Sequence, residues 1–230
     1  MIELFAAAAA GASAGVAAHA RADVSFLVLG DSYSIGEGVA EHERWPAQLA
    51  AAMRARGIVV SHPQYIARTG WTSDELDAAI DEEARAHKLR PPYGLVSLMV
   101  GVNDQYRGRP VAEFRPHFSK LLDRAIAFAG GHPQHVFVLS IPDWGRTPFA
   151  RAQGRDSTAV TGELDAYNAA TAQLCAARGV RWIDITALTR ADGGGEAVVD
   201  DGLHPSPAMY ARWVQKIGSD SGFSFAGARN

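Results

Sequence analysis

The stretch Val24-Ser25-Phe26-Leu27-Val28-Leu29-Gly30-Asp31-Ser32 decides the fold class. Its apolar run is nearly continuous, as expected for a strand of a parallel sheet that is buried on both faces. Gly30 closes the run and allows a tight turn, which can present the hydroxyl of Ser32 at the edge of the sheet. The sequence therefore predicts a buried strand that leads directly into a polar turn.

Similar apolar runs follow this one along the chain. They lie at residues 58–66, 95–100, 135–139 and 180–184. Helical patterns fill the gaps, at residues 45–55, 72–80, 118–129, 164–175 and 206–217. This repeated alternation of strand and helix favours an α/β fold with an open parallel sheet and helices on both faces. Such sheets bind their ligands at the carboxyl ends of the strands.

Local signals set the expected ends of some of these helices. Thr72-Ser73-Asp74-Glu75 is a capping-box sequence, and Ser206 can cap the last helix with Pro207 in its first turn. Pro116 is poorly tolerated inside a helix, so we expect the third helix to begin or kink near Arg115.

The composition fits a single domain, which we place at residues 23–218. The chain has 230 residues, of which 47% are hydrophobic, enough for a substantial core. With 22 basic and 25 acidic residues its net charge is −3, so no basic field favours nucleic acid or anionic lipid as a partner. The single cysteine, Cys175, allows neither an internal disulfide nor a thiolate metal cluster. We expect it to be a small core residue.

Residues 1–22 form an alanine-rich segment with two opposing features. Residues 5–18 are an apolar run followed by small residues, as in a signal peptide, yet Glu3 stands where such a signal carries a basic residue. Export and cytoplasmic retention therefore stay open. No stretch approaches the ~20 apolar residues of a membrane-spanning helix, so we expect no stable membrane association. Residues 192–195 are expected to form a flexible loop and residues 219–230 a loose tail.

The motif Asp201-Gly202-Leu203-His204-Pro205 carries the strongest chemical signal. A carboxylate three residues before a histidine can hold one ring nitrogen and leave the other free to take a proton from a serine hydroxyl. Ser32 is the candidate serine, which gives the chain order serine, aspartate, histidine. The neighbouring Asp200 is a competing carboxylate, but the spacing of Asp201 suits the loop.

Structural explanations compete with a catalytic one for the other polar residues. A serine after an aspartate in such a turn is usually a helix cap, and we expect Asp31 to be a turn-stabilising acceptor. Residues 11–15 match a Gly-x-Ser-x-Gly nucleophile pattern, but no strand precedes them. His42 between two glutamates could suggest a metal site, although alternating charges after a loop are usually solvated.

Two further residues can stabilise an oxyanion, the negatively charged oxygen that develops during acyl transfer. Gly70 precedes the capped helix, where a backbone N–H can face an anion, and Asn103 offers a side-chain amide just after the third strand. Each of them alone is more often a simple turn residue. Their combination with the serine and the histidine favours catalysis.

These residues occur in four ordered blocks, Gly30-Asp31-Ser32, Gly70, Gly101-Val102-Asn103-Asp104 and Asp201-Gly202-Leu203-His204. The blocks resemble those of the SGNH (GDSL) hydrolase family over residues 24–218. The resemblance implies a flavodoxin-like three-layer α/β/α sandwich with a five-stranded parallel sheet, and a serine esterase that needs no cofactor or metal. It also implies the site residues, namely Ser32 as nucleophile, Asp201 and His204 as its partners, and an oxyanion hole of the Ser32 N–H, the Gly70 N–H and the Asn103 amide. The sequence departs from the family in one place, where Tyr33 follows Gly-Asp-Ser instead of the frequent leucine.

The substrate is less well defined than the chemistry. Loops after the third and fourth strands offer aromatic residues that either line a pocket or pack on the domain. The candidate lining residues are Tyr33, Trp71, Tyr106, Trp144 and Phe149. We expect a small-molecule ester with a small or medium acyl group, because the sequence has no long apolar segment of the kind that forms a lid over a lipid-binding site. Stacking of Trp144 on a sugar would favour deacetylation of a carbohydrate.

Other functions stay open at this point. Within the family these are carbohydrate O-deacetylase, thioesterase and lysophospholipase activities. A different class is a flavodoxin-like module in which residues 30–38 cradle a phosphate or flavin and no reaction occurs. That alternative leaves Asp201 and His204 unexplained. The sequence does not indicate an oligomeric state.

Overall fold

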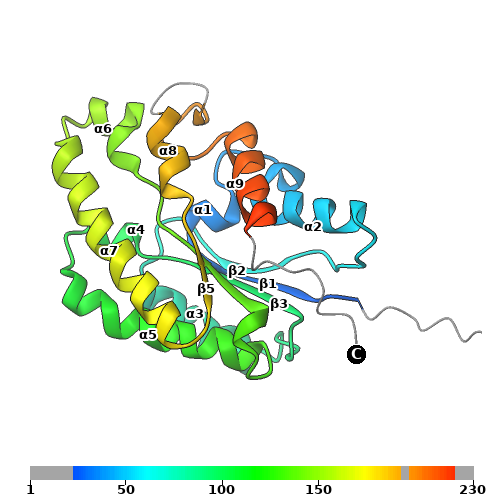
Figure 1. Ribbon diagram of the computed structural model, residues 1–230. Coiled ribbons are helices and arrows are strands. Elements are labelled where there is room, and N and C mark those ends of the chain that lie inside the picture. Colours follow the sequence, from blue (N-terminus) through cyan, green and yellow to red (C-terminus); the bar gives the residue numbers. More distant parts are fainter. Residues whose placement is uncertain (1–22, 193–196, 221–230) are drawn as a thin grey trace, which may run out of the picture.

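The computed structural model describes residues 23–192 and 197–220 and contains a sheet of five parallel strands (Figure 1). The order across the sheet is β2-β1-β3-β4-β5, so the direction in which strands are added reverses between β1 and β3. Ligands bind at this reversal in doubly wound sheets. The strands are β1 Phe26–Gly30, β2 Gln64–Ala67, β3 Leu95–Met99, β4 Val136–Leu139 and β5 Arg181–Ile183.

Helices cover both faces of this sheet, which confirms the predicted three-layer α/β/α sandwich (Figure 1). On one face α2, Trp45–Ala55, packs against α9, Pro207–Ser219. On the other face α5, Val111–Phe128, packs against both α3, Ser73–Arg85, and α7, Ser157–Ala177. Shorter helices follow the strands, at α1 Ser32–Ile35, α4 Val102–Tyr106, α6 Pro148–Ala152 and α8 Thr186–Asp192.

The hydrophobic core lies between the sheet and its helices. Every residue of β1 and β3 is buried, as the continuous apolar runs predict for strands covered on both faces. Trp45 of α2 packs against Phe26 of β1 and Phe137 of β4, with ring centroids 6.4 and 6.1 Å apart. Cys175 is buried in α7, as expected.

The helix signals in the sequence are confirmed at several ends. Helix α2 has the predicted bounds of 45–55. The N–H of Thr72 donates to Oε2 of Glu75 at 2.8 Å, which forms the predicted capping box of α3. Ser206 caps α9 by accepting a hydrogen bond from the N–H of Met209.

Two predicted boundaries are wrong. Helix α5 begins at Val111 and contains Pro116, so of the two predicted alternatives, a start or a kink near Arg115, the start is wrong. The proline removes one hydrogen bond to the carbonyl of Ala112, which is exposed and can be solvated, while Phe114 of the first turns becomes fully buried.

The second strand was also predicted too early in the chain. Strand β2 covers Gln64–Ala67, whereas residue Val60 forms only an isolated bridge to Val24. Pro63 separates the two segments and has no N–H to donate to a neighbouring strand.

The predicted segment 1–22, the glycines at 193–195 and most of the predicted tail, 221–230, lie outside the described residues. Within residues 23–192 and 197–220, no helix combines the length and the apolar character needed to cross a membrane.

Candidate active site

A pocket of about 190 Å³ opens at the carboxyl ends of the strands. Four of the residues named from the sequence motifs, Ser32, Gly70, Asn103 and His204, line this one pocket although they lie far apart in the chain. Asp201 is not in the lining and approaches His204 from the side. The remaining lining residues are Tyr33, Thr69, Val102, Tyr106, Trp144, Phe149 and Leu203.

The end of β1 places Ser32 at the first position of α1. The carboxylate of Asp31 caps this helix by accepting a hydrogen bond from the N–H of Tyr33 at 3.1 Å, so it is the turn-stabilising acceptor that the sequence predicts. The N–H of Ser32 has no acceptor within its own helix, because the first N–H groups of a helix lack one. Ser32 can therefore offer both a hydroxyl and an N–H to the pocket.

Gly30 is required by close packing around this turn. A Cβ atom at Gly30 would lie 2.1 Å from Oγ of Ser34 and 2.5 Å from the carbonyl oxygen of Met99 on β3. Both distances are far below normal contact, so only glycine lets α1 begin this close to β3.

Asp201 organises the loop that carries His204. Its Oδ1 accepts hydrogen bonds from the N–H groups of Leu203 at 2.7 Å and His204 at 2.9 Å. Its Oδ2 lies 2.6 Å from Nδ1 of His204. Burial would raise the pKa of Asp201, but the hydrogen bonds from His204 and Leu203 hold this pKa below its ordinary value. The carboxylate therefore stays ionised and keeps the Nδ1 proton of the ring, leaving Nε2 free to accept another.

The rest of the loop is held by main-chain contacts. Val198 and Pro205 form an antiparallel bridge, and the N–H of Val199 donates to the carbonyl of His204 at 2.8 Å. Gly202 has a φ of +69°, a conformation that favours glycine. Its carbonyl accepts a hydrogen bond from the N–H of Phe149 at 3.0 Å, which couples the histidine loop to the pocket wall.

Tyr33 lies behind the histidine ring. The two rings are tilted, with centroids 5.5 Å apart, and Tyr33 is 3% exposed. Burial and the nearby Asp31 raise the pKa of its phenol, so the hydroxyl stays protonated. This packing of Tyr33 against the ring limits the positions open to His204.

The two other predicted oxyanion donors lie beside each other. Nδ2 of Asn103 donates to the carbonyl of Trp71 at 2.8 Å, and the residue before Trp71 is Gly70. Because an amide nitrogen carries two hydrogens, Asn103 keeps one for a ligand in the pocket. Gly70 has a φ of +84° and needs the freedom of glycine there.

Aromatic side chains form the outer wall of the pocket. Tyr106 meets Trp144 edge to face with ring centroids 5.3 Å apart, and Phe149 meets Trp144 at 6.3 Å. Trp144 is only 1% exposed, and its Nε1 donates to Oε1 of Gln105 at 2.8 Å. Tyr106 is 45% exposed, so it is the ring that a ligand at the mouth of the pocket would meet first.

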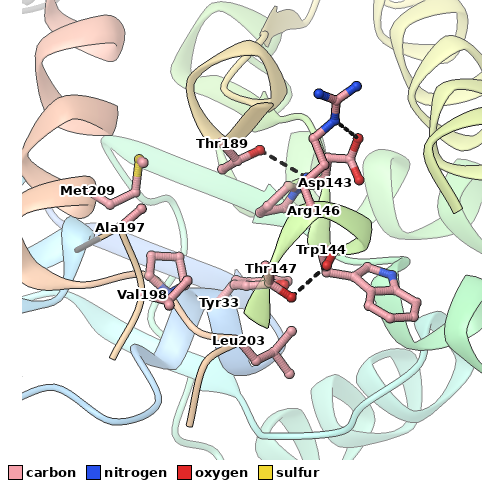
Figure 2. Close-up of a pocket in the computed structure, with 12 residues that line it drawn as sticks. Tyr33, Asp143, Trp144, Arg146, Thr147, Thr189, Ala197, Val198, Leu203 and Met209 are labelled. Atoms are coloured by element: carbon pink, nitrogen blue, oxygen red, sulfur yellow. Dashed lines mark hydrogen bonds and ion pairs between the residues drawn. The ribbon is translucent and has the colours of Figure 1, made fainter. Parts of the chain in front are cut away.

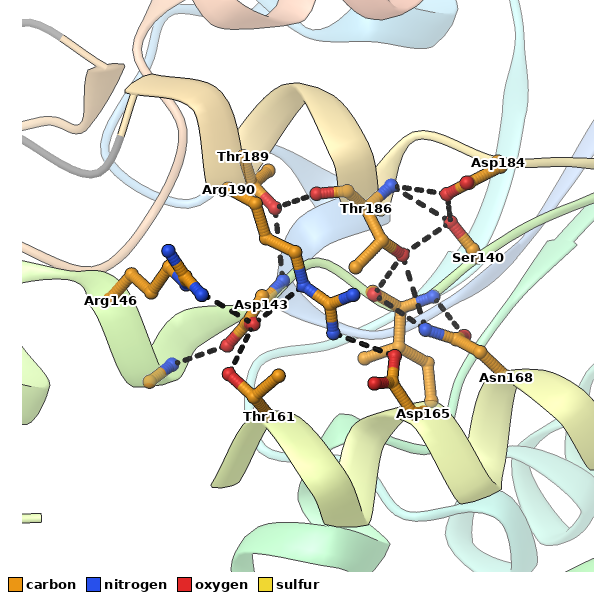
Figure 3. A network of polar contacts seen from close by, with 12 residues as sticks. Ser140, Asp143, Arg146, Thr161, Asp165, Asn168, Asp184, Thr186, Thr189 and Arg190 are labelled. Carbon is orange, nitrogen blue, oxygen red and sulfur yellow. Dashed lines mark hydrogen bonds and ion pairs between the residues drawn. The ribbon is translucent and has the colours of Figure 1, made fainter. Parts of the chain in front are cut away.

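A buried polar network fixes the loop that carries Trp144 (Figure 3). The carboxylate of Asp143 accepts hydrogen bonds from the N–H of Gly145, the hydroxyl of Thr161 and Nε of Arg190. The side chain of Asn168 holds the N–H and the carbonyl of Ile141. These contacts tie the loop after β4 to α7 and α8, which makes Trp144 a rigid wall.

A second, smaller cavity of about 20 Å³ adjoins the pocket (Figure 2). It has room for about one water molecule. Tyr33, Trp144 and Leu203 line both spaces and separate them. The cavity is otherwise lined by residues that include Thr147, Val198, Pro205 and Met209.

Most of the residues that line the pocket, but not all, were predicted from the sequence. Trp71 was predicted to line the pocket, yet its side chain packs against the hydrophobic core and only its carbonyl contacts Asn103. Thr69, Val102 and Leu203 were not singled out as lining residues, although each stands next to a motif residue. That adjacency is the signal that could have found them.

His42, the histidine between two glutamates, is exposed in a short 3-10 helix, Glu41–Glu43. Over the described residues, no group of three or more histidine, cysteine, aspartate or glutamate side chains is arranged to hold a metal ion.

Solved structures of several esterases resemble this fold. Esterase EstA from Pseudoalteromonas sp. is 16% identical, with a TM-score of 0.64 over 85% of this chain and 95% of that one. A mutant of Axe2, an acetyl-xylooligosaccharide esterase from Geobacillus Stearmophilus, is 16% identical, with a TM-score of 0.66 over 90% and 97%. Phospholipase A1 from Streptomyces albidoflavus NA297 is 19% identical, with a TM-score of 0.63 over 86% and 99%. At these identities the likeness concerns the fold.

The family of the protein is identified from its sequence. No curated protein matches it significantly. The model of the GDSL-like Lipase/Acylhydrolase family matches residues 28–212, which include the serine turn, both oxyanion candidates and the histidine loop up to His204. Because this match covers well over half of the chain, the protein belongs to the GDSL-like lipase/acylhydrolase family and is a hydrolase of ester bonds.

Proposed function

We propose that the protein is a serine esterase that acts on carboxylic esters through Ser32, His204 and Asp201. The observation that carries this proposal is the 2.6 Å contact between Oδ2 of Asp201 and Nδ1 of His204, at a pocket that Ser32 also lines. A carboxylate on one ring nitrogen is the arrangement that makes the other nitrogen a general base for a serine.

The reaction would proceed in two steps. Nε2 of His204 takes the proton of the Ser32 hydroxyl while Oγ attacks the ester carbonyl, and the protonated ring then gives this proton to the leaving alcohol. Water, activated by the same nitrogen, hydrolyses the acyl-enzyme. The oxyanion of each tetrahedral intermediate is held by the N–H of Ser32, the N–H of Gly70 and the amide of Asn103.

The pocket supports a small or medium acyl group. Its volume is about 190 Å³, and Val102, Phe149 and Trp144 are the hydrophobic side chains on which an acyl group could pack. Trp144 is too deeply buried to stack its face on a sugar. Tyr106 is exposed, but the guanidinium of Arg155 lies over its ring at 5.6 Å from the centroid, so at most one face is open to a sugar. A neighbour named as an acetyl-xylooligosaccharide esterase and another named as a phospholipase keep acetylated carbohydrates and lysophospholipids as alternative substrates.

Covalent labelling tests the nucleophile without a guess at the substrate. We expect a fluorophosphonate to add one adduct to the intact mass of the wild type and none to Ser32→Ala, with both proteins folded by circular dichroism. A series of p-nitrophenyl esters from acetyl to decanoyl would then measure the acyl preference. Labelling that persists in Ser32→Ala would exclude Ser32, and an unlabelled but yellow wild type would favour a flavin-binding module.

A further inference from the structure

The turn that carries Gly70 is held by residues from the end of β3 onwards. Nη2 of Arg107 donates to the carbonyl of Gly70 at 2.6 Å, and Nδ2 of Asn103 donates to the next carbonyl, that of Trp71, at 2.8 Å. Further along the same turn, the carboxylate of Asp104 accepts hydrogen bonds from the N–H of Ser73 at 2.9 Å and from its hydroxyl at 2.8 Å. Three residues of the segment 70–73 are thus held by three residues of the segment 103–107.

Gly70 has no side chain that could anchor this turn by packing. A Cβ atom built on Gly70 would meet no heavy atom within 4 Å, so the residue faces open space. Its φ of +84° lies in the region that favours glycine, so hydrogen bonds to the neighbouring peptide planes, and not side-chain packing, hold this conformation. Within the turn, the N–H of Trp71 donates to the carbonyl of Arg68 at 3.3 Å, and the hydrogen bond from Arg107 to the Gly70 carbonyl is a second restraint on the same peptide plane, which follows the oxyanion donor.

Arg107 is itself anchored at its other side. Its guanidinium pairs with the carboxylate of Glu75 at 3.3 Å, and Oε2 of Glu75 accepts the N–H of Thr72 in the capping box of α3. The side chain is 46% exposed, so the ion pair alone would contribute little to stability. Its hydrogen bond to a carbonyl beside the pocket needs another explanation.

We propose that Arg107 is a positioning residue for the oxyanion hole, which binds the Gly70 carbonyl and so helps to hold the turn that presents the Gly70 N–H. This inference rests on the proposed esterase function. Asn103 performs both tasks at once, because one N–H holds the Trp71 carbonyl and the other is available to the oxyanion. Arg107 touches no reacting atom and acts only through the turn.

Kinetics of Arg107→Ala test the proposal on the full-length enzyme with p-nitrophenyl acetate. Loss of a whole oxyanion donor costs about 10²- to 10³-fold in rate, so we expect a loosened donor to lower kcat about tenfold. KM should stay within about twofold, since the effect is on the transition state. Arg107→Lys keeps the charge beside Glu75 but not the planar guanidinium, so its kcat should lie between those of the wild type and Arg107→Ala.

Chemical rescue separates positioning from a general structural role. Guanidinium chloride at a non-denaturing concentration should raise kcat of Arg107→Ala severalfold and leave that of the wild type unchanged, whereas sodium chloride at the same ionic strength should do neither. Arg178→Ala is the matched control, because Arg178 is also a partly exposed arginine paired with an acid, Asp123, but lies just before β5, at the opposite edge of the sheet. Its kcat should equal that of the wild type.

Two results would overturn the inference while the wild type hydrolyses esters normally. One is an unchanged kcat in Arg107→Ala. The other is a fall in kcat that matches a fall in folded fraction and is not relieved by guanidinium or by Arg107→Lys. A wild type that neither turns over esters nor reacts with a fluorophosphonate would instead overturn the esterase proposal and this inference together.

Discussion

Asp201 binds His204 at two points with its two oxygens. Oδ1 accepts the main-chain N–H of His204 at 2.9 Å, and Oδ2 contacts the ring nitrogen Nδ1 at 2.6 Å. One carboxylate therefore shapes the turn and also sets the tautomer of the ring. A substitution that keeps the shape and removes the charge separates these two roles.

Asp201→Asn is that substitution. Its oxygen can still accept the main-chain N–H groups, but its NH₂ group at the position of Oδ2 would donate to Nδ1 and put the ring proton on Nε2, where no base is then left. We expect kcat to fall by about 10⁴-fold, as in a reference triad, while the unfolding midpoint changes little. Steady-state rates and a thermal melt check both parts.

Asp200→Asn is the matched control, because Asp200 is the exposed neighbour in the same turn. It should retain the wild-type kcat. Equal losses of kcat in Asp200→Asn and Asp201→Asn would mean that Asp201 is not the specific carboxylate that activates the histidine.

Gly30→Ala tests the close approach between α1 and β3. The new Cβ would meet the Met99 carbonyl at 2.5 Å, and backbone on that side cannot yield as a side chain can. We expect the free energy of unfolding to drop by about 1–3 kcal/mol, with loss of activity as Ser32 shifts. Gly162→Ala, inside α7 with no atom within 4 Å of the added Cβ, should instead stabilise by about 0.5–1 kcal/mol. Urea unfolding curves that show equal stability for both variants would contradict this account of Gly30.

Much of this site could be predicted because its residues follow strands. Apolar runs identify the strands, and parallel strands bring their carboxyl ends to one edge, so Ser32, Gly70 and Asn103 were placed together by topology alone. The short spacing between Asp201 and His204 also fixed their contact locally. Local contacts of this kind do not depend on how distant segments pack.

Contacts between distant segments could not be predicted from such local signals. The pairing of Arg107 with Gly70 spans 37 positions and follows from the exact seating of α4 against the turn before α3. Trp71 was misassigned for the same reason, since only packing decides whether an indole enters a pocket or the core. The start of α5 was misjudged because the burial of Phe114 offsets the hydrogen bond lost at Pro116.

Asp31 gives the stability of the protein a pH dependence. Burial, opposed by the Tyr33 N–H and helped by nearby Asp104, raises its pKa from 3.8 to about 7. The folded state therefore binds this proton more tightly than the unfolded state, so the stabilising contribution is complete below about pH 4 and is lost as the pH rises to about 7. The loss is at most about 4 kcal/mol.

Asp31→Asn should remove this dependence. Asparagine keeps an oxygen for the Tyr33 N–H, so the cap of α1 is preserved while the ionisable group is gone. We expect the variant to gain stability over the wild type progressively between about pH 4 and pH 7, and to keep a constant advantage above that range. Urea unfolding of both proteins at a series of pH values measures the difference between their free energies of unfolding. The contributions of other titrating groups are common to both proteins and largely cancel in this difference. A difference that does not change with pH would show that Asp31 ionises normally in the fold.

The hydrogen bond from Nε1 of Trp144 to Oε1 of Gln105 is predicted to hold the pocket wall in place. Gln105→Leu leaves the indole N–H buried without an acceptor, which should cost about 1–3 kcal/mol of unfolding free energy. In a Trp144→Phe background the same change should cost less, because the donor is already absent. A double-mutant cycle in urea therefore should give a coupling of about 1 kcal/mol, and a coupling near zero would mean that packing alone holds Trp144. The pocket rim gives a second readout, since a Trp144 released from Gln105 would disturb the neighbouring Tyr106 ring and shift the acyl preference of Gln105→Leu relative to the wild type.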